Sequence, residues 1–230
     1  MREKTGILIF SRSTDIECSV KKFDGNQSFF ESQKERLENL CSKTGLDTIW
    51  YNEHLQVGGN FGERFCNSIS SVFSKGYNSL IIIGNDSPQL KYYHLQSSID
   101  SLQSGRVSLG KSFDGGFYLL AIKKQHFNYP EFLNLSWNTS KVSSEIIQLL
   151  QTKAKVSFIS TLKDVDNQLD FSSLLNFSKQ LYTDVILILK RIQKFFDFNF
   201  QNPSLFNEKI IFGSFQNKAP PILSRVCRTS

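Results

Sequence analysis

The chain has few of the residues that build zinc sites, disulfide frameworks or nucleophile-base pairs. Its four cysteines (Cys18, Cys41, Cys66 and Cys227) show neither CxxC spacing nor a paired pattern, and its three histidines stand apart from one another. We therefore expect reduced thiols, and we exclude zinc-cluster and disulfide-framework proteins. No Ser-His-Asp or Cys-His arrangement is recognisable, which argues against a hydrolase built on such a nucleophile.

Long apolar runs are also lacking. The first run, Gly6–Phe10, is too short for the core of a signal peptide, and the later run Val185–Leu189 is far below the length of a membrane span. We expect a cytoplasmic protein. With 230 residues, 40% of them hydrophobic and 21% charged, the chain can bury one sizeable core.

The basic excess is confined to one end of the chain. Of the net charge of +6, most comes from residues 185–230, where seven Lys and Arg residues face only Asp197 and Glu208. The larger, preceding part is nearly neutral. It has no arginine-rich arm and no aromatic-basic motif, so we expect no nucleic-acid partner.

Apolar periodicity alternates between strand and helix through residue 180. This alternation predicts an α/β fold with a mostly parallel sheet and helices on both faces. The expected strands lie near 7–10, 47–51, 80–83, 106–110, 117–122 and 155–159, and the expected helices near 27–42, 61–76, 88–105, 142–150 and 166–175. We take residues 1–180 as the main domain.

Residues 181–230 form a separate segment in this prediction. An amphipathic helix near 184–196 carries Lys190, Arg191 and Lys194 on its polar side, and the pattern fades after Phe198 into irregular chain. A basic amphipathic helix can lie on an anionic membrane surface. We favour instead a packing helix, or a helix that forms a homodimer.

Asp86 is the most informative carboxylate in the sequence. The buried strand Leu80–Ile83 ends at Gly84, and Ser87 and Pro88 are suited to the N-cap and first turn of a following helix. Ligands of open α/β sheets bind at the carboxyl ends of strands. We therefore interpret Asp86 as a metal ligand, to which Asn85 could add an oxygen; the alternative is a carboxylate that merely favours a helix N-terminus.

Five motifs occur in an order and spacing that resemble a known family. They are Phe61–Phe65 (FGERF), Ile83–Pro88 (IGNDSP), Leu109–Leu120 (LGKSFDGGFYLL), Ser136–Thr139 (SWNT) and Lys163–Asp166 (KDVD). Over roughly residues 5–180 the chain resembles a bacterial family of uncharacterised glycosyltransferase-like proteins that is related to phospholactate guanylyltransferases.

The resemblance implies a GT-A type, Rossmann-like fold of the nucleotide-diphospho-sugar transferase superfamily. It implies a nucleotide or nucleotide sugar, a small acceptor whose identity the sequence does not give, and Mg²⁺ or Mn²⁺. Asp86 corresponds to the metal-binding carboxylate of the family. A second metal ligand corresponds to Asp166 or its neighbour Asp164.

The remaining candidates are expected to contact nucleotide or substrate. They are Arg12, Arg64, Asn85 and the turn Asp114, Gly115 and Gly116, which corresponds to a segment near the acceptor pocket. Purely structural roles stay open as alternatives. Asp114-Gly115 is a common hairpin dipeptide, Asp166 could cap a helix, and Arg64 could pair with Glu63 or Glu53 on the surface.

The chain departs from its relatives in the loop after the first strand. Nucleotide-transferring relatives carry a Gly- and Lys/Arg-rich loop there, whereas residues 10–18 (FSRSTDIEC) contain no Gly or Lys and have two added carboxylates. Such a loop is a poor cradle for a triphosphate. We therefore predict a metal-dependent glycosyltransferase or nucleotidyltransferase, and as the alternative a non-catalytic nucleotide-binding or scaffold protein on the same fold.

Overall fold

The protein is built on one six-stranded sheet. The computed structural model describes residues 3–21, 26–167, 170, 173–183, 185–191 and 194. The strand order is β2-β1-β3-β5-β4-β6, and only β5 runs against its neighbours. The strands are β1 (Thr5–Phe10), β2 (Asp47–Tyr51), β3 (Ser79–Ile83), β4 (Val107–Ser112), β5 (Phe117–Lys123) and β6 (Val156–Leu162). The predicted α/β class and mostly parallel sheet are confirmed.

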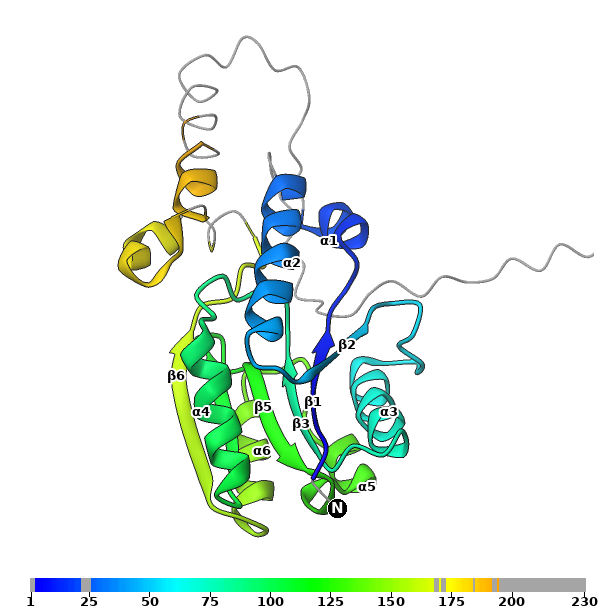
Figure 1. Cartoon of the computed structure of the whole chain (residues 1–230). Helices are drawn as coiled ribbons and strands as arrows, with labels where there is room; N and C mark the ends of the chain where they lie inside the picture. The colour runs from blue at the N-terminus through cyan, green and yellow to red at the C-terminus, as the bar shows by residue number, and fades with distance from the viewer. Residues whose placement is uncertain are drawn as a thin grey trace, which may run out of the picture.

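Helices cover both faces of the sheet (Figure 1). They are α1 (Thr14–Val20), α2 (Asn26–Ser42), α3 (Phe61–Ser74), α4 (Tyr92–Gln103), α5 (Tyr129–Leu133) and α6 (Val142–Gln151), with short 3₁₀ turns η1 (Lys124–His126) and η2 (Leu175–Gln180). In β3, Leu80 and Ile82 pack with the α3 and α6 side, whereas Ile81 and Ile83 pack with the α2 and α4 side. Alternation on a strand buried from both sides explains its unbroken apolar run.

The reversed strand β5 brings the β4–β5 turn to the same edge as Asp86. In the register of β3 and β5, Ile83 lies opposite Leu119, and the Gly84 N–H donates to the Tyr118 carbonyl at 3.2 Å. The start of β5 therefore lies beside the end of β3. Residues 113–116 consequently stand at the carboxyl edge of the parallel strands.

Two local predictions differ from the structure. Helix α4 begins at Tyr92 with Lys91 as its N-cap, not at Pro88. The hydroxyl of Ser87 donates to Asp164 instead of capping a helix, and the carbonyl of Leu90 accepts from Arg36 Nη1 at 2.8 Å. Long-range partners thus hold this segment as a loop. The polar segment after β1, predicted as a loop, contains the short helix α1.

A third apolar cluster lies between α2 and the helical residues 185–191. Val185 and Leu189 are buried there with Phe29 and Phe30 of α2. The apolar face of this helical segment therefore packs on its own chain. The domain boundary after residue 180 and a homodimer through this helix stay predictions. The predicted irregular chain after Phe198 lies outside the described residues.

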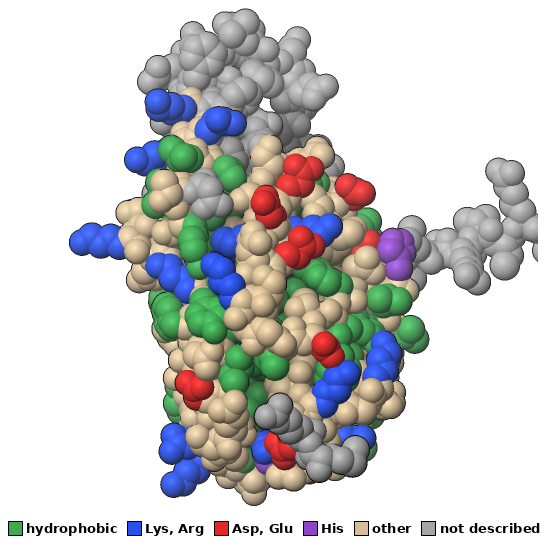
Figure 2. Space-filling model, in the orientation of Figure 1, with side chains coloured by type: hydrophobic (Ala, Val, Ile, Leu, Met, Phe, Trp, Pro, Cys, Tyr) green, Lys and Arg blue, Asp and Glu red, His purple; other side chains and the backbone are tan. Residues whose placement is uncertain are grey.

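The surface charge of the described part is uneven. Figure 2 shows acidic side chains gathered over α1 and α2, and basic side chains over the helical segments that follow β6. Among the described helices, none combines the length and apolar character that crossing a bilayer would need.

Candidate functional site

The carboxyl edge of the sheet gathers charged side chains from three distant segments around Lys21. Its Nζ atom lies 3.5 Å from Glu17 Oε2, 3.6 Å from Asp86 Oδ2 and 3.3 Å from Asp166 Oδ1. The same atom donates a hydrogen bond to the Val165 carbonyl at 2.7 Å. We call Lys21, Glu17, Asp86 and Asp166 the ion cluster.

Lys21 is enclosed by the protein. Its side chain is 6% exposed, and its Nζ lies 5.7 Å from the ring centroid of buried Phe30. Burial alone would lower the pKa of Lys21, but the carboxylates of Glu17, Asp86 and Asp166 outweigh it and raise the pKa above its usual value. The ammonium group is therefore charged at neutral pH.

This geometry does not fit a divalent ion held jointly by Asp86 and Asp166. Mg²⁺ holds its oxygen ligands at about 2.0–2.1 Å, whereas the two carboxylates turn to the Lys21 ammonium at 3.3 and 3.6 Å. Within the described residues, no group of three or more His, Cys, Asp or Glu is arranged to hold a metal ion. Asp164 lies apart, where it accepts from the Ser87 hydroxyl.

The predicted metal ligands thus divide into two positions. Asp86 and Asp166 do come together, as their correspondence to the family implied, and Asn85 precedes Asp86 in the same half-buried loop. Asn167, beside Asp166, accepts from the Asp170 N–H through its Oδ1 at 3.1 Å. The metal-binding role of these carboxylates stays a prediction.

Arg64 is a buried cation, so the alternative of a surface ion pair with Glu63 or Glu53 is wrong. Arg64 is 6% exposed. Its Nε and Nη2 atoms have no hydrogen-bond partner among the described residues. Glu63 instead accepts from the Gly59 N–H and the Asn60 side chain. Burial, and then the positive charge of nearby Arg12, lower the pKa of Arg64.

Arg12 follows the end of β1 and completes a pair of guanidinium groups. Its side chain is 11% exposed, and its Nη1 lies 3.8 Å from Glu17 Oε2 at the margin of the ion cluster. Two like charges and unpartnered donors are unfavourable unless an anion accompanies them. We call Arg12 and Arg64 the guanidinium pair.

The turn Asp114-Gly115-Gly116 is a structural turn that docks on the start of α6. Gly115 has φ +87°, and a Cβ placed on it would lie 2.2 Å from the Ser140 carbonyl oxygen. The Gly116 N–H donates to Asp114 Oδ1 at 2.9 Å, and Ser143 N–H donates to the Gly115 carbonyl. The hairpin interpretation is confirmed, and contact with an acceptor stays a prediction.

We expect Gly115→Ala to destabilise the protein more than Gly76→Ala does. Both glycines have a similar positive φ, so alanine is strained by about 1–2 kcal/mol at either position. Only at Gly115 does the added carbon also meet backbone, since nothing lies within 4 Å of a Cβ at Gly76. Chemical denaturation of both variants measures the difference; equal losses of stability would refute the close contact.

An aromatic cluster accounts for two of the family motifs. Phe61 and Phe65 of α3 pack against the ring of Trp137, and a Cβ on Gly62 would lie 2.3 Å from the indole. The indole N–H donates to the Phe132 carbonyl at 2.9 Å. Phe61, Gly62, Phe65 and Trp137 thus serve the packing of α3 near the site.

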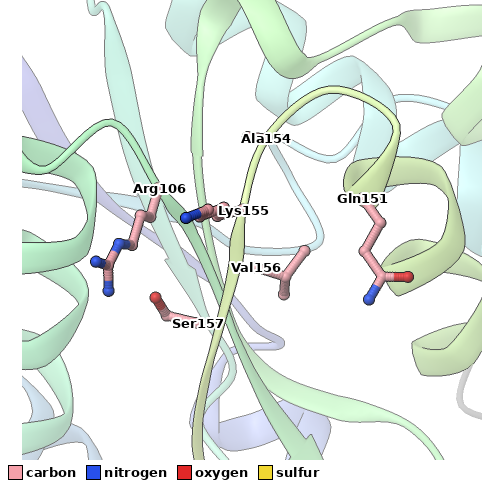
Figure 3. Close-up of a pocket in the computed structure, with 6 residues that line it drawn as sticks. All are labelled: Arg106, Gln151, Ala154, Lys155, Val156 and Ser157. Atoms are coloured by element: carbon pink, nitrogen blue, oxygen red, sulfur yellow. The ribbon is translucent and has the colours of Figure 1, made fainter.

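A hollow of about 560 Å³ lies at the opposite edge of the sheet. Figure 3 shows Arg106, Lys155 and Ser157 on one side of the β6 strand, with Gln151 and Val156 on the other, so these side chains do not converge on one point. The hollow therefore brings no predicted site residue together.

Sequence reasoning missed Glu17 and Lys21. A signal was present, because Ser13 with Asp15 and Glu17 in the next turn is typical of a helix start, and a helix places Glu17 and Lys21 four residues apart on one face. The prediction of a loop over residues 10–18 left that spacing unrecognised.

Comparison with known proteins supports the predicted family and fold. Residues 35–139 match the family described as "Uncharacterized protein conserved in bacteria (DUF2064)". The match agrees with the predicted bacterial family over this part of the chain. The match includes Arg64, Asp86 and the Asp114–Gly116 turn, whereas Arg12, the α1 residues of the ion cluster and Asp166 lie outside it.

A solved structure shows the same architecture. A protein of Desulfovibrio desulfuricans G20, proposed to be a nucleotide-diphospho-sugar transferase, is 18% identical with a TM-score of 0.69, over 84% of this chain and 98% of that one. Less similar is Rv0371c of Mycobacterium tuberculosis H37Rv, solved as a manganese complex, with 14% identity, a TM-score of 0.42, and coverage of 76% and 98%. This chain thus shares the fold of the Desulfovibrio desulfuricans structure. No curated protein matches the chain.

Proposed function

We propose that this DUF2064 protein is a transferase that binds a nucleotide sugar or nucleotide through its phosphate groups. The guanidinium pair at the carboxyl edge of the sheet is the observation that carries the proposal. Arg64 has two buried nitrogen atoms that lack partners among the described residues, and Arg12 lies near enough to lower its pKa. A phosphate group supplies the acceptor oxygens and the negative charge that this arrangement needs.

The position of the pair agrees with this ligand. It stands where β1 ends and α3 begins, at the edge where open α/β sheets bind nucleotides. The first helical turn of α3 also presents backbone N–H groups, although Asn60 Oδ1 already accepts from the Glu63 N–H. The positive charge at this site therefore comes from the side chains of Arg12 and Arg64. Relatives use a Gly- and Lys/Arg-rich loop instead.

Each group then has a defined part in the transfer. The guanidinium groups of Arg12 and Arg64 bind the diphosphate and stabilise the negative charge that develops on it as the leaving group departs. The ion cluster orders the loop after β3 against the segment after β6. The Asp114–Gly116 turn borders the acceptor, as its correspondence to the family implies.

Titration calorimetry with uridine, cytidine and guanosine diphosphates and their sugar conjugates tests this proposal. We expect one of the series to bind the full-length protein, and Arg12→Gln to weaken that binding by about tenfold, as for loss of one charge-assisted hydrogen bond. Arg106→Gln, an exposed arginine at the opposite edge, is the matched control and should leave binding unchanged.

Turnover separates transfer from the non-catalytic alternative. A transferase releases the nucleotide when an acceptor is supplied, and a nucleotide-binding scaffold does not. If none of the nucleotides or nucleotide sugars binds, with or without Mn²⁺, both forms of the proposal fail.

A further inference from the structure

The ion cluster suggests how this site keeps its carboxylates together. Asp86 and Asp166 belong to segments that follow β3 and β6, and like charges brought close together repel unless a cation lies between them. In many nucleotide-binding sites a divalent ion has this role. Here the atom between them is Lys21 Nζ, at 3.6 Å and 3.3 Å.

The surroundings hold the ammonium group in that place. Lys21 Nζ donates to the Val165 carbonyl at 2.7 Å, and the Val165 N–H in turn donates to the Asp86 carbonyl at 2.9 Å. The side chain is 6% exposed and lies against Phe30, which is 2% exposed. A metal ion bridging the two carboxylates would have to displace a buried, hydrogen-bonded charge.

The dimensions and charges also suit an ammonium ion. The oxygen atoms lie 3.3–3.6 Å from Lys21 Nζ, distances of an ammonium–carboxylate contact, whereas Mg²⁺ holds its oxygen ligands at about 2.0–2.1 Å. Lys21 and Arg12 provide two positive charges against the three carboxylates of Glu17, Asp86 and Asp166. The cluster is thus largely neutralised by the chain's own residues.

We propose that Lys21 is the resident cation of this site, and that the protein binds its phosphate-bearing ligand without a divalent metal ion. The second half of this inference rests on the proposed function. Lys21 acts as a positioning residue: it holds the Asp86 loop against the Asp166 segment and leaves the phosphates to the guanidinium pair. The site would differ in this from its implied metal-dependent relatives.

Mn²⁺ alone, titrated into the full-length protein, tests the first half. Electron paramagnetic resonance counts free Mn²⁺, and we expect no saturable binding up to millimolar concentration. Saturable binding that is lost in Asp86→Asn would overturn the inference. This measurement needs no ligand and no altered lysine, so it stands even if variants of Lys21 fold poorly.

Lys21→Ala provides a converse test. Removing the side chain vacates the position between the carboxylates, so Mn²⁺ should raise the melting temperature of Lys21→Ala and leave that of the wild type unchanged. The double variant Lys21→Ala/Asp86→Asn should lose this stabilisation. Equal responses of wild type and Lys21→Ala to Mn²⁺ would contradict the assignment of Lys21.

Nucleotide binding with a chelator present tests the second half. Binding that persists without metal supports the inference. Binding that requires Mn²⁺ overturns it while leaving the proposed function intact. If no nucleotide binds under either condition, the proposed function and this second half fail together, and the Mn²⁺ titration still decides whether Lys21 is the resident cation.

Discussion

Lys21→Met is expected to lower the free energy of unfolding by about 3 kcal/mol, because removing one partner of a buried ion pair leaves uncompensated charge. We take the lower end of the usual range since Asp86 and Asp166 are 28% and 35% exposed and can be solvated in part. For a chain of this size, each kcal/mol shifts the melting temperature by about 2–4 °C. Methionine keeps the aliphatic bulk of the lysine side chain, so the loss of stability measures the contribution of the charge.

The pH dependence of this loss follows from the pKa of Lys21. That pKa is raised, so the contribution of Lys21 is complete below the usual lysine pKa and is lost only in strongly alkaline solution. At neutral pH the full loss should appear. Thermal denaturation of the variant and the wild type from neutral to alkaline pH measures this dependence.

Lys4→Met is the matched control. Lys4 Nζ lies 3.0 Å from Asp47 Oδ2, closer than any carboxylate lies to Lys21, but both side chains are about half exposed. Exposed ion pairs contribute about 0–1 kcal/mol. A loss in Lys21→Met no larger than in Lys4→Met would show that Lys21 has no special role in stability.

Arg64→Met is expected to weaken nucleotide binding by about 10- to 100-fold, as expected for losing hydrogen bonds to a charged group worth about 1.5–3 kcal/mol. The same substitution should leave stability unchanged or raise it. Two buried nitrogen atoms of Arg64 have no partner in the described part of the chain, and a buried charge of this kind can be replaced by an apolar side chain without loss.

Arg36→Met separates a binding role from a structural one. Arg36 is as buried as Arg64, but its Nη1 donates to the Leu90 carbonyl at 2.8 Å and its Nη2 lies 3.4 Å from the Ser87 carbonyl. We expect this variant to melt at a lower temperature. If Arg64→Met is destabilised as Arg36→Met is, and binds nucleotide normally, Arg64 is a structural residue.

Elements defined by their own apolar pattern were predictable from the sequence. Two examples are the five-residue buried strand β3 and the stripe of Phe61, Phe65 and Ile69 on α3. Both are local signals, because the apolar residues that define them lie within a few positions of one another in the sequence. The same stripe could have located Arg64, which lies three residues after Phe61 and therefore on its face.

Features that depend on distant partners were not predictable in this way. Helix α4 begins later in the chain than predicted because Arg36 and Asp164 bind the preceding loop. Nothing in the sequence of residues 87–91 indicates those contacts. The ion cluster likewise joins α1 to the segment after β6. Sequence motifs did place Asp86 and Asp166 at one site, but they gave no indication of the charge that lies between them.

The spacing of the ion cluster along the chain has a consequence for its synthesis. Lys21 and its hydrogen-bond acceptor Val165 are 144 residues apart. A ribosome adding about 5–20 residues per second needs roughly 7–30 s to make that stretch. Of the carboxylates in the cluster, Glu17 is made before Lys21, Asp86 is made during this interval, and Asp166 is made after it. The cation is therefore enclosed only when nearly the whole sheet has been made, and its burial marks the completion of the nascent domain.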